Sequence, residues 1–146
     1  MKRMRKTFVA HWIICLVCLG VFSFAWRYGV PQLIWASDAS YMTSVIAALV
    51  VVTAVWLGWQ AWRVDDPHSF VINADFGQEA QLLAPALGML GTVIGLSMQA
   101  KALVAGAASL GALSTALFTT GVGIAGFIVL KVLTLNLEAG IKRAGR

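Results

Sequence analysis

The chain has little charge and no polar region long enough to form a soluble domain. Charged residues make up 12% of its 146 residues, whereas hydrophobic residues make up 60%. A soluble fold of this size would have to expose far more apolar surface than its polar residues can offset. The composition therefore excludes an ordinary soluble domain and predicts an all-α integral membrane protein, surrounded by the lipid bilayer.

Acidic residues are absent from every long apolar stretch of the chain. None of the six Asp and Glu residues falls within the four stretches that we interpret below as membrane spans. A charge at the bilayer centre costs about 2.5–3.5 kcal/mol on insertion scales and is usually retained only for function. The chain therefore has no carboxylate of its own that could relay protons, and any group that titrates in the membrane must come from a partner.

Sets of catalytic or metal-binding residues are also missing. Cys15 and Cys18 lie in an apolar stretch, and we interpret both as small buried hydrophobic side chains. We interpret His11 as an interfacial polar residue and 65–68, Asp-Asp-Pro-His, as a solvated turn. We therefore expect neither an enzyme nor a resident cofactor. We also expect no nucleic-acid binding, because the basic residues do not lie on a folded soluble face.

The uncharged stretches are long enough to cross a bilayer four times, since one crossing needs about 20 residues. They predict four transmembrane helices, at about residues 8–26, 41–62, 80–103 and 110–135. The first follows a basic start but lacks an Ala-x-Ala cleavage site, so we expect a retained helix rather than a signal peptide. Residues 1–79 then hold two outer spans and a short cytoplasmic loop, and residues 80–146 hold a helical hairpin and a basic tail.

Basic residues predict the orientation of the chain. With four spans, both termini share one side of the membrane with the 63–79 loop. Only Arg27 and Lys101 fall on the other side. The first side holds nine basic residues: Lys2, Arg3, Arg5, Lys6, Arg63, Lys131, Lys142, Arg143 and Arg146. Since cytoplasmic loops carry the excess of Lys and Arg, both termini are predicted to lie in the cytoplasm.

Two local patterns mark where predicted spans meet the membrane surface. Trp56, Trp59 and Trp62 end the second span, which is typical of the aromatic belt at a membrane interface. Asp75, with Gln78 three residues later, is an arrangement of the capping-box kind. We expect Asp75 to cap the third span.

Small and hydroxyl residues are concentrated in the second half of the chain. Gly88, Gly91 and Gly95 lie at spacings of three and four, with Thr92 beside them. The fourth span holds four hydroxyl residues within seven positions, namely Ser114, Thr115, Thr119 and Thr120, followed by Gly121, Gly123 and Gly126. Small residues let membrane helices approach closely and hydroxyls bond across their interface, so tight packing is one interpretation. A polar stripe that meets water or a polar partner is the other.

These residues resemble the pore-forming helix pair of the MotA/TolQ/ExbB proton-channel family. Residues 85–88, Pro-Ala-Leu-Gly, resemble the same tetrapeptide of flagellar stator subunits. Residues 88–95 resemble the Gly-Leu-x-Gly-Thr-Val-x-Gly of the TolQ and ExbB branch. Residues 116–123 are similar to its Ala-Leu-x-x-Thr-Ala-x-Gly. The resemblance covers about residues 80–135, somewhat over a third of the chain.

The resemblance implies a subunit of a proton-motive-force-driven machine in the bacterial inner membrane. Five subunits would surround a dimer of single-span partners of the MotB/TolR/ExbD kind, each with an aspartate in the membrane. H+ or Na+ would reach that aspartate past pore-lining hydroxyls and drive rotation of one ring about the other. The positions that would line the pore are Thr92 and Thr120, with Ser114, Thr115 and Thr119 as additional lining. The packing or hinge positions would be Pro85, Gly88, Gly91, Gly95, Gly121 and Gly123, with Pro85 at the cytoplasmic end of the third span.

Two departures from the family pattern bear on this hypothesis. Thr115 stands where the ExbB branch commonly has Glu, which affects the ion and the hydration of the pore. The 63–79 loop stands where stator subunits have a large cytoplasmic domain, so force would leave through the partner into the periplasm. A non-conducting membrane scaffold, a small four-helix exporter and a holin-like pore remain open alternatives. Exporters of that size usually carry a carboxylate in their first span, and this chain has none there.

Overall fold

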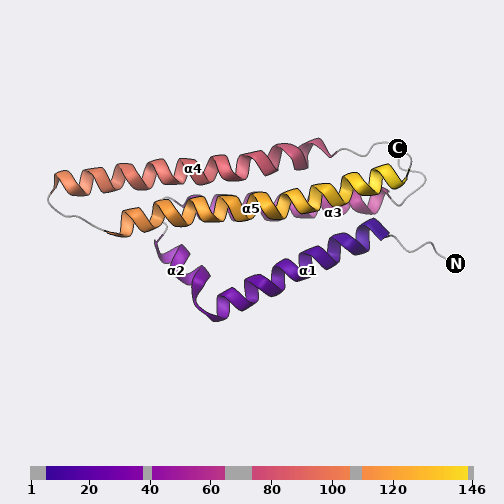
Figure 1. Ribbon diagram of the computed structural model, residues 1–146, viewed down its shortest axis with the longest axis horizontal. Coiled ribbons are helices and arrows are strands. Elements are labelled where there is room, and N and C mark those ends of the chain that lie inside the picture. The colour runs from indigo at the N-terminus through magenta and orange to yellow at the C-terminus, as the bar shows by residue number, and fades with distance from the viewer. Residues whose placement is uncertain (1–5, 38–40, 65–73, 106–109, 145–146) are drawn as a thin grey trace.

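A computed structural model of the chain describes residues 6–37, 41–64, 74–105 and 110–144 (Figure 1). Every regular element within these ranges is a helix: α1 (Lys6–Arg27), α2 (Val30–Ser37), α3 (Met42–Val64), α4 (Asp75–Val104) and α5 (Leu110–Arg143). Four of them, α1, α3, α4 and α5, are long and apolar enough to cross a membrane. The prediction of an all-helical protein is therefore confirmed for the described residues, as is the presence of four helices suited by length and composition to cross a membrane.

The bounds of the first two spans are close to prediction, but α4 and α5 are longer than expected. α4 begins at Asp75 rather than near residue 80, and α5 continues to Arg143 rather than ending near residue 135. At a rise of 1.5 Å per residue, their 30 and 34 residues extend about 45 and 51 Å. A hydrocarbon core is only about 30 Å thick. The uncharged windows therefore mark the part of each helix that suits lipid, not the ends of the helix.

The prediction that Asp75 caps this helix is wrong. Ala74 occupies the N-cap position and makes no side-chain capping bond, so Asp75 is already the first helical residue. The Gln78 side chain does not return to the start of its own helix. Its amide instead donates a hydrogen bond to the Glu138 carboxylate of α5, at 3.0 Å. This contact joins α4 and α5 in the polar extension beyond their apolar segments.

A short helix, α2, occupies most of the stretch between α1 and α3. Gly29 separates α1 from α2, with a left-handed φ of 75° that a glycine adopts without strain. Its N–H donates to the Trp26 carbonyl at 3.0 Å, and its carbonyl accepts from the Leu33 N–H at 3.0 Å. Pro31 is tolerated because it lies in the first turn, where an N–H has no helical acceptor.

The helices form a three-helix bundle with a fourth helix that leaves it. α4 and α5 run antiparallel along most of their lengths, and α3 packs against both (Figure 1). α1 meets the bundle at its start and then diverges, and α2 leads the chain back (Figure 1). α1 begins and α5 ends at the same end of the molecule, while α4 ends and α5 begins at the opposite end.

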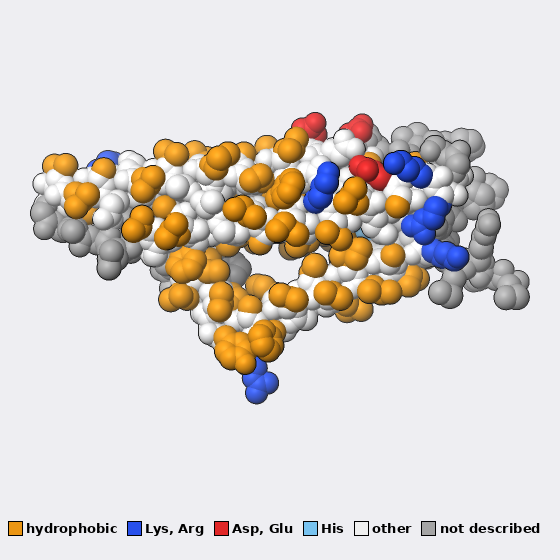
Figure 2. All heavy atoms as spheres, in the orientation of Figure 1, with side chains coloured by type: hydrophobic (Ala, Val, Ile, Leu, Met, Phe, Trp, Pro, Cys, Tyr) orange, Lys and Arg blue, Asp and Glu red, His pale blue; other side chains and the backbone are white. Residues whose placement is uncertain are grey.

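The core lies between α3 and α5, near the end where α5 finishes. It contains five fully or almost fully buried side chains, Leu57, Ala61, Val64, Leu133 and Leu137. Large apolar side chains also cover the outer surface, and most of the visible charged side chains gather near this end of the molecule (Figure 2). This distribution suits a surface that meets lipid along its length and water at its ends.

Candidate functional site

Glycine backbone forms the closest contacts between α4 and α5. A Cβ on Gly88 would lie 3.0 Å from the Thr119 carbonyl oxygen and 3.2 Å from the Gly123 Cα. A Cβ on Gly123 would lie 2.8 Å from the Ala84 carbonyl oxygen. Because the obstacles are backbone atoms, a larger residue at either position would push the helices apart. The two helices therefore approach as closely as small residues permit in membrane helix pairs.

Thr119 lies inside this interface. Its side chain is fully buried, and its hydroxyl donates to the Ala116 carbonyl of the preceding turn at 3.2 Å. A Cβ on Gly91 would come within 2.8 Å of the Thr119 side chain, so Gly91 makes the space that Thr119 fills. Gly95, one turn further along α4, is buried as well. The Thr119 side chain therefore packs within a single chain and is not exposed on its surface.

The remaining predicted positions lie in different surroundings. Gly121 is exposed and no atom lies within 4 Å of where its Cβ would be. Pro85 lies inside α4, which begins at Asp75. Ser114 is half-buried near the start of α5. Thr115 belongs to α5, but its side chain lies outside the part of the chain that the structure describes.

Thr92 and Thr120 meet across the α4–α5 interface through their hydroxyl groups. The Thr92 hydroxyl is 3.0 Å from the Gly88 carbonyl and 3.2 Å from the Ala116 carbonyl. The Thr120 hydroxyl is 3.0 Å from the same Ala116 carbonyl. Each hydroxyl has one proton and two lone pairs, so the two protons can form two hydrogen bonds at a time among the two carbonyls and the contact between the hydroxyls. Lone pairs remain that can accept a hydrogen bond from water or coordinate a cation.

This hydroxyl pair lies on the edge of the hairpin that α3 does not cover. Thr120 and Gly126 are six residues apart on α5, which places them about 120° apart around the helix. Gly126 faces α3, since a Cβ there would lie 3.1 Å from the Val50 side chain. Thr92 and Thr120 are both half-buried, whereas Thr119 is fully buried. The pair is therefore accessible from the side of the hairpin away from α3.

One member of this cluster could not be recognised from the sequence. The carbonyl of Ala116 accepts from Thr119 and lies within hydrogen-bond distance of both Thr92 and Thr120. It is a backbone group, so the identity of the side chain gives no signal of its role. Only the spacing of three and four residues to the two threonines of α5 points to it, because helical hydroxyls bond carbonyls at those distances in sequence.

The polar residues of α1 form no second site of this kind. His11, which we interpreted as interfacial, is only 5% exposed and packs over Gly58 of α3, where the missing side chain leaves room for the ring. Its Nε2 lies 3.6 Å from the Cys15 sulfur. Cys15 and Cys18 are free thiols that are partly buried. Among the described residues, no three His, Cys, Asp or Glu side chains are placed to hold a metal. Residues 65–68 lie outside them.

No protein-family model, curated protein or solved structure matches the chain.

Proposed function

We propose that this chain is an ion-channel subunit, with H+ as the transported ion, of a proton-motive-force-driven machine in the bacterial inner membrane. A single-span partner supplies the aspartate that binds the ion. The observation that carries the proposal is the meeting of the Thr92 and Thr120 hydroxyls on the uncovered edge of the α4–α5 hairpin. Two hydroxyls from two helices form a polar contact on helices whose large exposed side chains are mainly apolar.

The glycine interface and the hydroxyl pair have separate tasks in this proposal. Gly88 and Gly123 hold α4 and α5 in close contact, so the two hydroxyls stay at a fixed separation. The pair then offers lone pairs and rotatable protons to water or an ion beside it. No Asp or Glu occurs from residue 80 to residue 137, so the proton-binding carboxylate belongs to the partner. This division of labour is what the resemblance to the MotA/TolQ/ExbB family implies.

The assembly that suits this site is a pentamer around two partner helices, with both termini in the cytoplasm. The edge with Thr92 and Thr120 would face the partner, and α3 and α1 would lie further out. Two features support this arrangement. α3 packs on the side of the hairpin away from the pair, and α1 exposes apolar side chains along most of its length.

A flux measurement tests the proposal. The chain is purified with a single-span partner of the MotB/TolR/ExbD kind, reconstituted in liposomes, and assayed for H+ and Na+ flux. Thr120→Val removes the hydroxyl while keeping the shape, and we expect at least a tenfold loss of flux. Thr120→Ser is the matched control, because it keeps the hydroxyl and should keep most of the flux. Equal flux in the wild type and Thr120→Val would show that ions do not pass this pair.

A non-conducting scaffold is the second candidate, and the burial of Thr119 against Gly91 favours it. That contact accounts for one hydroxyl by packing alone, and the same could hold for the others. A scaffold predicts a pentameric complex with the partner that shows no flux in the wild type. A dimeric particle that binds no single-span partner would instead favour the small exporter.

A further inference from the structure

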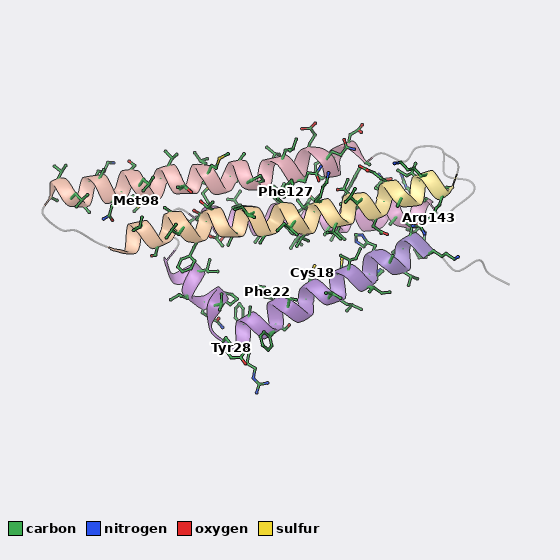
Figure 3. All side chains as sticks on the ribbon, viewed as in Figure 1. Cys18, Phe22, Tyr28, Met98, Phe127 and Arg143 are labelled. Carbon is green, nitrogen blue, oxygen red and sulfur yellow. The ribbon has the colours of Figure 1, made fainter. Side chains whose placement is uncertain are left out.

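A large apolar groove lies between α1 and α3, on the other side of the bundle from α4. Its volume is about 840 Å³. α1 lines it from Phe8 to Phe22 and α3 from Val50 to Trp62, and α5 adds two residues, Val129 and Leu133. Figure 3 shows Cys18 and Phe22 on the side of α1 that faces the bundle, where α1 has begun to diverge. Among the described residues, no Lys, Arg, Asp or Glu lines this groove.

The α1–α3 groove is closed and anchored at one end. The Asn136 amide of α5 donates to the Thr7 carbonyl of α1 at 3.1 Å. The rings of Phe8 and Trp62 meet edge to face, with centroids 4.9 Å apart. These contacts hold the start of α1 against the bundle, so the groove widens towards the middle of the membrane span. An open apolar wedge of this kind in a membrane protein is filled from the bilayer or by a partner.

The size of the groove distinguishes an acyl chain from a transmembrane helix. A helix with side chains is about 10 Å across and must run about 30 Å through the hydrocarbon core, a volume of roughly 2400 Å³. The groove holds about a third of that volume. Its 15 residues along α1, from Phe8 to Phe22, extend about 22 Å. This length exceeds one leaflet, about 15 Å, but falls short of a full crossing of about 30 Å, so the groove does not run through the whole hydrocarbon core.

Positive charge and aromatic rings surround the closed end of the groove. Lys6 is exposed at the start of α1, and Arg63 is exposed near the end of α3, with its guanidinium carbon 5.3 Å from the Trp59 ring centroid. In the sequence, residues 1–6 and 63–66 contain five basic and two acidic residues. Trp side chains and basic residues together are typical of the headgroup level of a membrane. The charge at this end therefore complements an anionic headgroup.

We propose that the α1–α3 groove binds one anionic phospholipid from the leaflet at the end where α1 begins. Its acyl chains fill the apolar wedge between α1 and α3, and its phosphate lies near Lys6 and Arg63. The lipid completes the packing of α1, which buries only Thr7 and His11 against the rest of the protein. The bound lipid thus acts as a structural part of the subunit, independently of whether the subunit conducts ions.

Native mass spectrometry of the protein in mild detergent tests this proposal. The probes are phosphatidylglycerol and phosphatidylcholine with identical acyl chains, added in equal amounts. We expect one phosphatidylglycerol retained per chain, at least fivefold over phosphatidylcholine. Val51→Trp fills the groove and should remove that lipid. Val52→Trp is the matched control, because Val52 is equally exposed, at 60% against 62%, but does not line the groove.

A second arm tests the headgroup contact. Replacing both Lys6 and Arg63 with Gln should reduce the preference for phosphatidylglycerol at least threefold. Should Val51→Trp lose helicity by circular dichroism, Val55→Trp repeats the test one turn along the same groove. Equal lipid retention by the Val51→Trp and Val52→Trp proteins would overturn the proposal. So would retention without headgroup preference in the wild type, or cross-linking of a second protein helix into the groove.

Discussion

The glycines of the α4–α5 hairpin are not equivalent, although their spacing in the sequence makes them look alike. A Cβ on Gly123 would lie 2.8 Å from the Ala84 carbonyl oxygen, whereas a Cβ on Gly121, two residues earlier, would have no atom within 4 Å. A methyl group at Gly123 must push α4 away, and overpacking of this kind typically costs about 1–3 kcal/mol. At Gly121 a methyl group meets nothing within one chain, and replacing a helical glycine gains up to about 1 kcal/mol.

We therefore expect Gly123→Ala to lower the thermal unfolding temperature in detergent, and Gly121→Ala to leave it unchanged or raise it. Tryptophan fluorescence during heating measures both. Because Gly121 is exposed on the single chain, Gly121→Ala also tests whether this position contacts another subunit of the proposed pentamer. A variant of normal stability that no longer assembles would place Gly121 in the interface between copies. Equal stability of the two variants would contradict the glycine interface described above.

Adjacent threonines of α5 should differ in their effect on ion flux. Thr119 is fully buried against Gly91, whereas Thr120 is half-buried beside Thr92 on the edge of the hairpin. Thr119→Val keeps the packing and loses one hydrogen bond, worth about 1 kcal/mol of stability. We expect it to leave flux through the reconstituted complex within twofold of the wild type, while Thr120→Val loses most of it. Loss of flux in Thr119→Val but not in Thr120→Val would indicate that ions pass through the buried α4–α5 interface instead.

At the scale of the elements, α1 should be the least firmly held helix. Its start is fixed by the Asn136 amide on the Thr7 carbonyl, and Gly140 leaves room for the Thr7 side chain. Asn136→Ala removes a bond worth about 1 kcal/mol, which corresponds to a roughly fivefold larger population of detached α1. In a Cys18→Ser background, Cys15 should then react faster with N-ethylmaleimide in the detergent-solubilised protein. Leu135→Ala, on an exposed side chain of the same helix, is the control and should react like the parent.

The elements also show where sequence reasoning works and where it stops. Uncharged windows identify the four spans, because lipid excludes charge along a helix crossing it. They do not give the ends of α4 and α5, since helices continue into water where charge is permitted. They also do not show that Thr119 and Thr120 face different ways, because that depends on which side of α5 meets α4. The Ala116 carbonyl is a backbone group, so the type of side chain at this position does not predict its role.

At the scale of the whole molecule, charge and helix direction make a joint prediction about orientation. α1 begins and α5 ends at one end of the molecule, whereas α4 ends and α5 begins at the other (Figure 1). Basic residues are concentrated near the first end, in sequence and on the visible surface (Figure 2). The positive-inside rule then places the end of α5 in the cytoplasm and the end of α4 in the periplasm.

Cysteine labelling in intact cells tests this orientation without changing any charge. In a background with Cys15 and Cys18 replaced by Ser, Val104→Cys reports on the end of α4, where Val104 is 92% exposed. Ala144→Cys reports on the exposed residue just after α5. We expect a membrane-impermeant maleimide to label Val104→Cys directly and Ala144→Cys only after permeabilisation, with equal labelling of both in lysed cells. The opposite pattern would indicate the inverse orientation, with the end of α5 in the periplasm. The excess of basic residues would then lie on the side that the membrane potential disfavours.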